Sequence, residues 1–152
     1  MSTPQPIRPE ELQRQLAGFC GTLDYHRLTA SIKPEILWTD GCEFLAEHAK
    51  CYWLLDAIAS HQSNQQVRRE PFQVWTLQVW TLQVKPAQAK PTRPAPMGSL
   101  ICRTDSEPEG KLLVTQHIAY TDFPLDTIKL YVVHSSIDGV QPNSIGMLPG
   151  EY

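Results

Sequence analysis

The sequence predicts a single α+β domain in which N-terminal helices pack on one face of a roughly four-stranded antiparallel sheet. Two observations indicate this fold class. Apolar residues recur at helical spacing through the first half of the chain, and alternation with period two begins at Phe72. Helices followed by strands are typical of α+β folds. A length of 152 residues suits one packed core, so we expect a flexible tail at 1–7 and one domain at 8–152.

The first helix is expected to begin at Pro9. Proline is favoured in the first turn because the N–H group that it lacks has no partner there, and the two acids that follow complement the positive end of the helix dipole. Leu12, Leu16 and Phe19 then recur at helical spacing. Their shared face predicts that this helix packs against the rest of the domain.

A second helical region follows a short apolar run at 36–38, which itself predicts a strand. Asp40 is expected to cap this region, with Glu43 reaching back to the free N–H groups as in a capping box. Apolar side chains cover a wide arc of residues 42–61, which predicts deep burial. The pattern leaves open whether residues 42–61 form one long helix or two short ones.

Four strands are predicted from Phe72 onward, where valines and aromatic residues alternate with polar ones. Their expected ranges are 72–84, 98–103, 111–120 and 127–134. Between the first two lies a proline-rich basic loop at 85–97, which holds four prolines and three basic residues. Proline cannot donate to a strand ladder, so this loop is expected to be extended and polyproline-like.

The first of these strands contains an immediate repeat, because Val74–Gln78 is followed by the identical pentapeptide Val79–Gln83. A repeat of five residues conflicts with the two-residue alternation of a strand, so the apolar residues change sides between the copies. Either a β-bulge takes up one residue, or the second copy overhangs the edge of the sheet. We therefore expect a bulge or an abrupt strand end between Thr76 and Thr81.

The repeat and the loop after it hold the candidate binding residues. Trp75 and Trp80 are candidates for stacking on a ligand or on single-stranded nucleic acid. Lys85, Lys90 and Arg93 would attract an anionic partner. The alternative interpretation is a tandem duplication tolerated near a strand end, beside a loop that is charged because it is exposed. The net charge of −3 argues against a surface built entirely for nucleic acid.

Another set of residues suggests an alternative function, a small enzyme that uses carboxylates in a cleft between helices and sheet. Asp56 interrupts an apolar stretch, and a buried carboxylate there would need a partner or a raised pKa. The alternative interpretation is that Asp56 lies on the polar edge of its helix or hydrogen-bonds a neighbouring segment. Asp40, Tyr120 and Asp122 are further candidates for this cleft. His117 is the fifth, although a plain surface histidine is the alternative interpretation. No catalytic or phosphate-binding motif and no Cys/His zinc spacing occurs, so no metal and no cofactor are predicted.

The compartment is inferred from the first residues and from the cysteines. The N-terminus has no apolar h-region, and no apolar run approaches the roughly 20 residues of a membrane helix. We therefore expect a cytoplasmic protein without membrane contact. Its four cysteines should then be reduced and packed as small apolar residues.

Six segments carry a resemblance to a known family. They are Trp38–Gly41, Phe44–Glu47, Tyr52–Ala59, Phe72–Trp75, Tyr120–Leu125 and Leu148–Tyr152. The chain resembles, over about residues 12–152, a family of small uncharacterised bacterial proteins, a domain of unknown function frequent in cyanobacteria and on mobile elements. The resemblance implies that the second Val-Trp-Thr-Leu unit is an insertion and that a helix break falls near Lys50, where relatives carry glycine. It brings no known activity.

The sequence therefore predicts a small cytoplasmic interaction or accessory module that binds protein or nucleic acid through a sheet face or the proline-rich loop, without catalysis. A homodimer is a further option for the partner, and the carboxylate enzyme is the alternative function. The two functions predict different surfaces. A binding module should show a flat apolar or basic patch, whereas an enzyme should show a concave polar pocket with a perturbed carboxylate.

Overall fold

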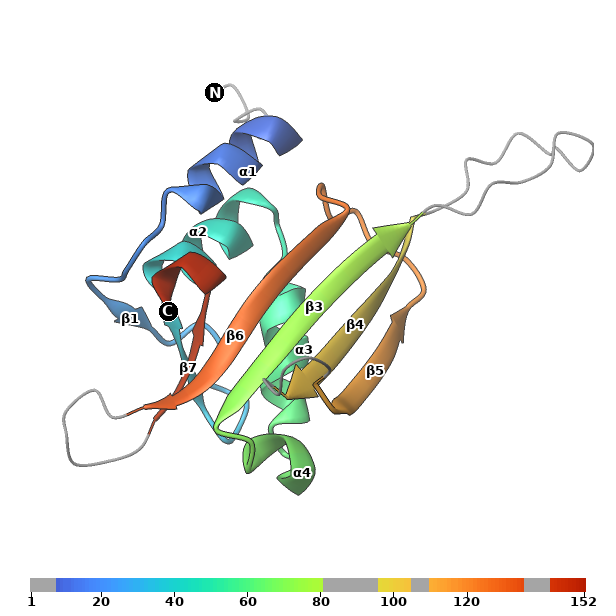
Figure 1. Cartoon of the computed structure of the whole chain (residues 1–152). Helices are drawn as coiled ribbons and strands as arrows, with labels where there is room; N and C mark the ends of the chain where they lie inside the picture. The colour runs from blue at the N-terminus through green and yellow to red at the C-terminus, as the bar shows by residue number, and fades with distance from the viewer. Residues whose placement is uncertain (1–7, 81–95, 105–109, 136–142) are drawn as a thin grey trace, which may run out of the picture.

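The structure, a computed structural model, describes residues 8–80, 96–104, 110–135 and 143–152 (Figure 1). Its helices are α1 (Pro9–Ala17), α2 (Asp40–His48), α3 (Tyr52–His61), α4 (Gln65–Arg68) and the short 3-10 helix η2 (Pro149–Glu151). Its strands are β1 (Tyr25–His26), β2 (Ile36–Thr39), β3 (Phe72–Trp80), β4 (Met97–Thr104), β5 (Leu112–Ile118), β6 (Thr127–Ser135) and β7 (Asn143–Met147). The α+β class is confirmed. The expected tail at 1–7 and most of the expected loop at 85–97 lie outside the described residues.

These strands form one sheet in the order β1-β2-β7-β6-β3-β4-β5. β6, β3, β4 and β5 are antiparallel neighbours and correspond to the four strands expected from the sequence. The expectation of a four-stranded antiparallel sheet is nevertheless wrong, because the sheet has seven strands and is mixed. β7 pairs in parallel with β2 and antiparallel with β6, which joins the N-terminal strands to the rest of the sheet.

β7 has a glycine where its neighbour has a large ring. Gly146 lies opposite Trp38 of β2, and the Trp38 ring fills the space in which a Cβ atom of residue 146 would stand. Trp38 is fully buried, and its indole N–H donates to the Thr29 hydroxyl at 3.0 Å. Close contact between β2 and β7 therefore depends on the missing side chain at Gly146.

The helices cover the sheet unequally. α3 and α4 lie behind the sheet in Figure 1, whereas α1 and α2 lie beside it, near β1 and β7. Gln73, Trp75 and Leu77 of β3 point to the side of α3 and are buried. The alternate residues of β3 point to the opposite face, which neither α3 nor α4 covers; we call it the open face (Figure 1). The expected packing of the N-terminal helices on one face is therefore correct for α3 but not for α1.

Two helices, α2 and α3, occupy the helical region 42–61. Lys50 has a positive φ of 54°, a left-handed conformation that ends the first helix. The N–H of Cys51 donates to the Ala46 carbonyl at 3.1 Å, and α3 begins at the next residue. The break lies where the family resemblance places a glycine, so lysine here occupies a conformation that glycine adopts at lower cost.

We expect Lys50→Gly to stabilise the fold by about 0.5–1 kcal/mol, because it removes a left-handed strain of about 1–2 kcal/mol but adds entropy to the unfolded chain. Urea unfolding followed by circular dichroism measures the change. Lys50→Ala, which removes the same ammonium group but keeps the Cβ atom, is the control and should bring no gain. A loss of stability in Lys50→Gly, as for glycine inside a helix, would contradict the break.

β3 is regular, since every residue from Gln73 to Trp80 pairs with β4 without a register shift. The bulge expected from the repeat does not occur in the described part of this strand: the alternation continues, so Gln73 stays on the core side and Trp80 stays exposed on the other side. Gln73 is fully buried: its amide exchanges hydrogen bonds of 2.7 and 3.0 Å with Gln62 and accepts from the Trp75 indole N–H at 3.0 Å. Gln73, Trp75 and Leu77 thus share the core face. The alternative, a strand end before Thr81, stays a prediction because residues 81–95 are not described.

A bulge does occur, but in β5. The register shifts between Cys102 and Arg103 of β4, which pair with Val114 and Leu112 respectively. Leu113 is the additional residue in β5. The shift places Leu112 beside Arg103 on the open face, and Leu112 is exposed.

The N-terminus of α2 is capped from two directions. Thr39 is the N-cap residue, and its hydroxyl oxygen accepts from the Cys42 N–H at 3.4 Å. Glu151 of η2 reaches the same turn from the far end of the sequence, accepting from the Thr39 hydroxyl at 2.6 Å and from the Gly41 N–H at 3.2 Å. A carboxylate at this position also complements the positive end of the helix dipole. The C-terminal turn is therefore part of the α2 cap.

The capping box expected from Asp40 and Glu43 is wrong. Asp40 is the first residue of α2, and Glu43 lies within the helix. Both carboxylates contact His26 of β1, Asp40 at 2.7 Å from Nε2 and Glu43 at 2.9 Å from Nδ1. These acids therefore fasten the edge strand β1 to α2.

Candidate functional site

A groove of about 600 Å3 lies on the open face, bordered by α1, η2 and the central strands. Val74, Thr76 and Gln78 of β3 line it, together with apolar and amide side chains from α1 and the start of β6. Among the described residues, those with charge that line it are Arg103 and Lys129, and none is an acid. The groove therefore has the polarity of a site for an anion.

The two cations flank β3. Arg103 of β4 pairs with Val74, and Lys129 of β6 pairs with Thr76 on the other side of the strand. Strand geometry separates their Cα atoms by about 12 Å. Both side chains are exposed, and within the described ranges no carboxylate forms an ion pair with either. Arg103 donates to the Gly110 carbonyl at 3.3 Å.

Aromatic side chains stand beyond the two ends of the groove. Trp80 ends the described part of β3, is 40% exposed, and has its ring centroid 6.5 Å from that of His117. Tyr152, which follows η2, is 76% exposed and contacts Phe72 and Tyr131 edge-on. The open face thus combines a cationic groove with an exposed ring near each end.

The binding residues expected from the sequence lie in different places in the structure. Trp75 is only 1% exposed and stacks on His61, so its role is in the core and the expectation that it binds a ligand is wrong. Trp80 lies on the open face, as the alternation of the strand requires. Lys85, Lys90 and Arg93 lie outside the described residues.

The carboxylate candidates do not meet in a cleft between helices and sheet. Asp56 is exposed on α3, which agrees with the interpretation that it lies on the polar edge of an otherwise apolar helix. Tyr120 and Asp122 are exposed in the connection after β5. His117 lies on the open face beside Trp80, and Asp40 lies at the start of α2. The groove on the open face contains none of these five residues, and the groove along α2 contains only Asp40.

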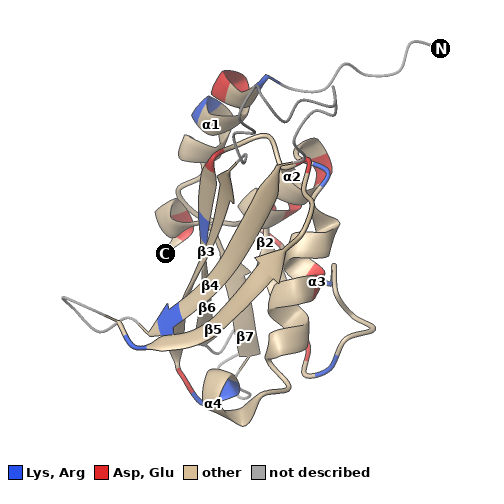
Figure 2. Cartoon of the chain, turned by 90° about the vertical axis from the view of Figure 1, so that its right-hand side faces the viewer, with Lys and Arg blue, Asp and Glu red and all other residues tan. Residues whose placement is uncertain are grey.

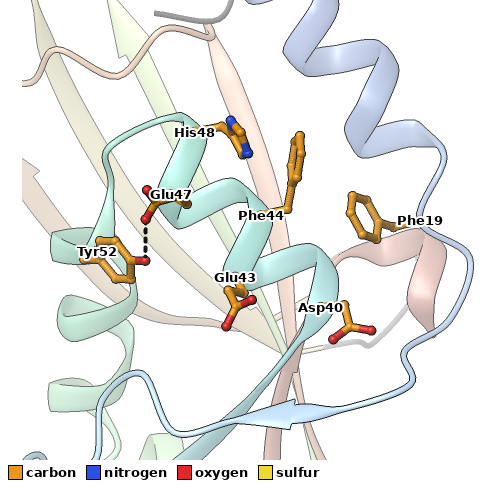
Figure 3. Close-up of a pocket in the computed structure, with 7 residues that line it drawn as sticks. All are labelled: Phe19, Asp40, Glu43, Phe44, Glu47, His48 and Tyr52. Carbon is orange, nitrogen blue, oxygen red and sulfur yellow. Dashed lines mark hydrogen bonds between the residues drawn. The ribbon is translucent and has the colours of Figure 1, made fainter. Parts of the chain in front are cut away.

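A second groove, of about 440 Å3, runs along α2 (Figure 3). Asp40, Glu43 and Glu47 line it, with the rings of Phe44 and His48 on the same helix. The spacing of these residues is that of one helix face, and each carboxylate already contacts a neighbouring side chain. We therefore regard this groove as the outer surface of α2.

Hydrogen bonds and burial shift the pKa values of two side chains on this surface, Asp40 and Tyr52. The pKa of Asp40 lies below its usual value because the carboxylate accepts from His26 and from the Leu23 N–H. The pKa of Tyr52 is raised by burial and by its hydrogen bond to Glu47. Neither shift creates a proton donor or acceptor that is active near neutral pH.

The cysteines follow the expectation in part. Cys42, Cys51 and Cys102 are buried and free, and burial raises the pKa of the Cys51 and Cys102 thiols to about 12. Cys20 is exposed, so the expectation that it packs in the core is wrong. Across the described ranges, no group of three or more ligand-type side chains is placed to hold a metal ion. Nor is any helix in these ranges long and apolar enough to cross a membrane.

Two residues of the open face, Lys129 and Tyr152, were not anticipated from the sequence, and Arg103 stood out only as one of the basic residues between positions 64 and 103. Each is an isolated polar or aromatic residue without a motif. Arg103 and Lys129 become neighbours only through the pairing of β4 and β6 with β3. Tyr152 reaches the open face because η2 docks near β6. A single sequence shows the alternation of a strand but not the order of strands in the sheet.

The fold and the site define a class of protein: an α+β domain that carries a cationic groove on the sheet face opposite α3, bordered by α1 and η2. A family model described as a family of unknown function (DUF6876) matches residues 10–152. The chain belongs to this family, which confirms the resemblance to a domain of unknown function. No curated protein and no solved structure shows a significant match to the chain.

Proposed function

We propose that this protein is an accessory module that binds nucleic acid through the groove on its open face, without catalysis. One observation carries the proposal: Arg103 and Lys129 line the same groove, and none of the described residues that line it is an acid. Arginine and lysine are the main ligands of phosphate groups in nucleic-acid complexes, and these contacts supply most of the sequence-independent affinity.

The rest of the groove also suits a nucleic acid. Hydroxyl and amide groups of Thr76, Gln78 and Thr127 lie among the lining residues, and such groups bond to phosphate and sugar oxygens. An acidic protein segment would use the same cations, but it would have no special use for exposed rings. Trp80 and Tyr152 beside the groove therefore favour nucleic acid over an acidic protein.

The distribution of charge is compatible with this function even though the net charge is −3. In Figure 2 the central strands are mostly uncharged, and the acidic segments lie mainly on the helices and connections. Local potential rather than net charge steers an anionic ligand, so a nucleic acid would approach the open face rather than α2.

The alternative function, a carboxylate enzyme, has less support. Asp56 and Asp122 are exposed and lie apart from both grooves, and Asp40 is engaged with His26. General acid–base catalysis needs a positioned group whose pKa lies near the working pH, whereas the pKa of Asp40 is lowered.

The proposal predicts that the double variant Arg103→Gln, Lys129→Gln binds a fluorescein-labelled oligodeoxythymidylate roughly tenfold or more weakly than the wild type, because two phosphate contacts are lost. Fluorescence anisotropy at low salt measures the affinity. The matched control is Arg27→Gln, Lys50→Gln, which removes the same charge from two exposed side chains outside the groove. The control should bind like the wild type.

An equal loss in both double variants would show that only net charge matters and would contradict the groove. Polyglutamate as a competitor tests the class of partner. If it displaces the oligonucleotide as well as unlabelled oligonucleotide does, the groove binds acidic protein and the proposal fails. Thermal unfolding of all variants verifies that they are folded.

A further inference from the structure

We infer that the nucleic acid bound on the open face is single-stranded, with unpaired bases stacked on Trp80 beyond one end of the groove and on Tyr152 beyond the other. The inference rests on the proposed function and adds the form of the nucleic acid and the residues that select it. It is carried by the rings, whereas the proposed function is carried by the cations.

Trp80 continues the surface of the groove. Gln78 lines the groove, and Trp80 is the next residue of β3 on the same face, about 7 Å further along the strand. Its indole is 40% exposed, although Trp is a residue type that folding usually buries. The nearest ring, that of His117, is 6.5 Å away and tilted by 44°, so it does not cover the indole face to face. A planar base can therefore stack there.

Tyr152 occupies the corresponding position at the η2 side. Pro149 of η2 lines the groove, and Tyr152 directly follows that helix. Phe72 and Tyr131 meet the Tyr152 ring nearly at right angles, at centroid distances of 5.0 and 6.1 Å. These edge contacts orient the ring, and it stays 76% exposed.

Phe72 and Tyr131 themselves have a structural role. They pack on a small apolar cluster of Val133, Ile145 and Met147 between β6 and β7. Tyr152 is not part of that cluster, so the cluster does not account for its ring on the open face. We therefore assign base stacking to Tyr152 and not to the two rings beneath it.

Exposed rings distinguish a single strand from a duplex. Bases in a duplex stack on each other and offer only their edges, whereas unpaired bases offer their faces to aromatic side chains. Cations between two stacking platforms are the arrangement used by proteins that bind single strands without sequence preference. Arg103 and Lys129 would hold the phosphates while Trp80 and Tyr152 hold the bases.

The test compares the affinity of the whole protein for an oligodeoxythymidylate of about 12 nucleotides with its affinity for a duplex of the same length. We expect the single strand to bind more tightly, and Trp80→Ala and Tyr152→Ala each to weaken it about tenfold. Trp80→Phe and Tyr152→Phe should keep most of the affinity, because a ring remains. Tyr52→Ala is the matched control, since Tyr52 is also 40% exposed but lies on α3 outside the open-face groove.

The outcomes separate this inference from the proposed function. One outcome would refute base stacking on Trp80 and Tyr152 but keep the groove as the binding site. In that outcome the single strand and the duplex bind equally, and Trp80→Ala binds like the wild type. The double variant Arg103→Gln, Lys129→Gln still binds weakly. If no oligonucleotide binds, the proposed function fails and this inference fails with it. A loss in Tyr52→Ala as large as that in Trp80→Ala would also overturn the assignment.

Discussion

Gly146→Ala is expected to destabilise the protein by about 3 kcal/mol, although alanine is usually the better residue in a strand. A Cβ atom at this position would overlap the six-membered ring of Trp38. The ring cannot withdraw easily, because Trp38 is fully buried and its N–H is bonded to Thr29. The contact joins β2 to β7, so the strain falls on the pairing that holds the N-terminal strands in the sheet.

Urea unfolding measures the effect as a lower midpoint with an unchanged m-value. Gly21→Ala is the control, because nothing lies within 4 Å of a Cβ atom at Gly21. The free energy of unfolding of that variant should lie within about 0.5 kcal/mol of that of the wild type. Adding Trp38→Leu to Gly146→Ala should recover part of the loss, since the smaller side chain leaves room. A wild-type midpoint for Gly146→Ala would contradict the close packing of β2 on β7.

Glu151→Ala is expected to cost about 2–3 kcal/mol, because it removes a carboxylate that accepts three hydrogen bonds. The donors are the Thr39 hydroxyl at 2.6 Å, the Leu148 N–H at 3.0 Å and the Gly41 N–H at 3.2 Å. Thr39 and Gly41 are buried, so water does not fully replace the lost acceptor. The variant should also weaken the docking of η2, and with it the position of Tyr152.

The same unfolding assay compares this variant with two others. Glu151→Gln keeps the shape and one acceptor oxygen, and we expect about half the loss. Asp56→Asn removes a carboxylate that is exposed on α3. Its free energy of unfolding should stay within about 0.5 kcal/mol of that of the wild type. If Glu151→Ala is no less stable than Asp56→Asn, the cap on α2 does not contribute as described.

Most of the strands that could be predicted are those whose own sequence alternates, whereas β2 was expected from its short apolar run. β3, β4, β5 and β6 show this alternation, and all four occur near their expected positions. β7 escaped prediction because its conformation is imposed by its two neighbours rather than by its residues. The repeat misled the prediction for a related reason: a regular strand buries Gln73, and that burial depends on the amide of Gln62, eleven residues away in the chain. Such pairings are tertiary and leave no local pattern.

The candidate site was predictable in part, through Trp80 and through Arg103 as one of the basic residues between positions 64 and 103. Trp80 was expected to be a binding residue, and the structure places it on the open face. Trp75, from the same repeat, points into the core because a five-residue spacing inverts the face of a strand. Arg103 and Lys129 lie 26 residues apart and meet only across β3, so strand order had to be known before they could be grouped.

The most direct test of the central claim is the salt dependence of oligodeoxythymidylate binding, compared between the wild type and Arg103→Gln, Lys129→Gln. Each phosphate contact to a single strand contributes about 0.7 to the slope of log affinity against log salt. Two lost contacts should therefore make the slope of the double variant shallower by about 1.4. An unchanged slope would show that these cations do not contact phosphate, and nucleic-acid binding through the open face would be refuted.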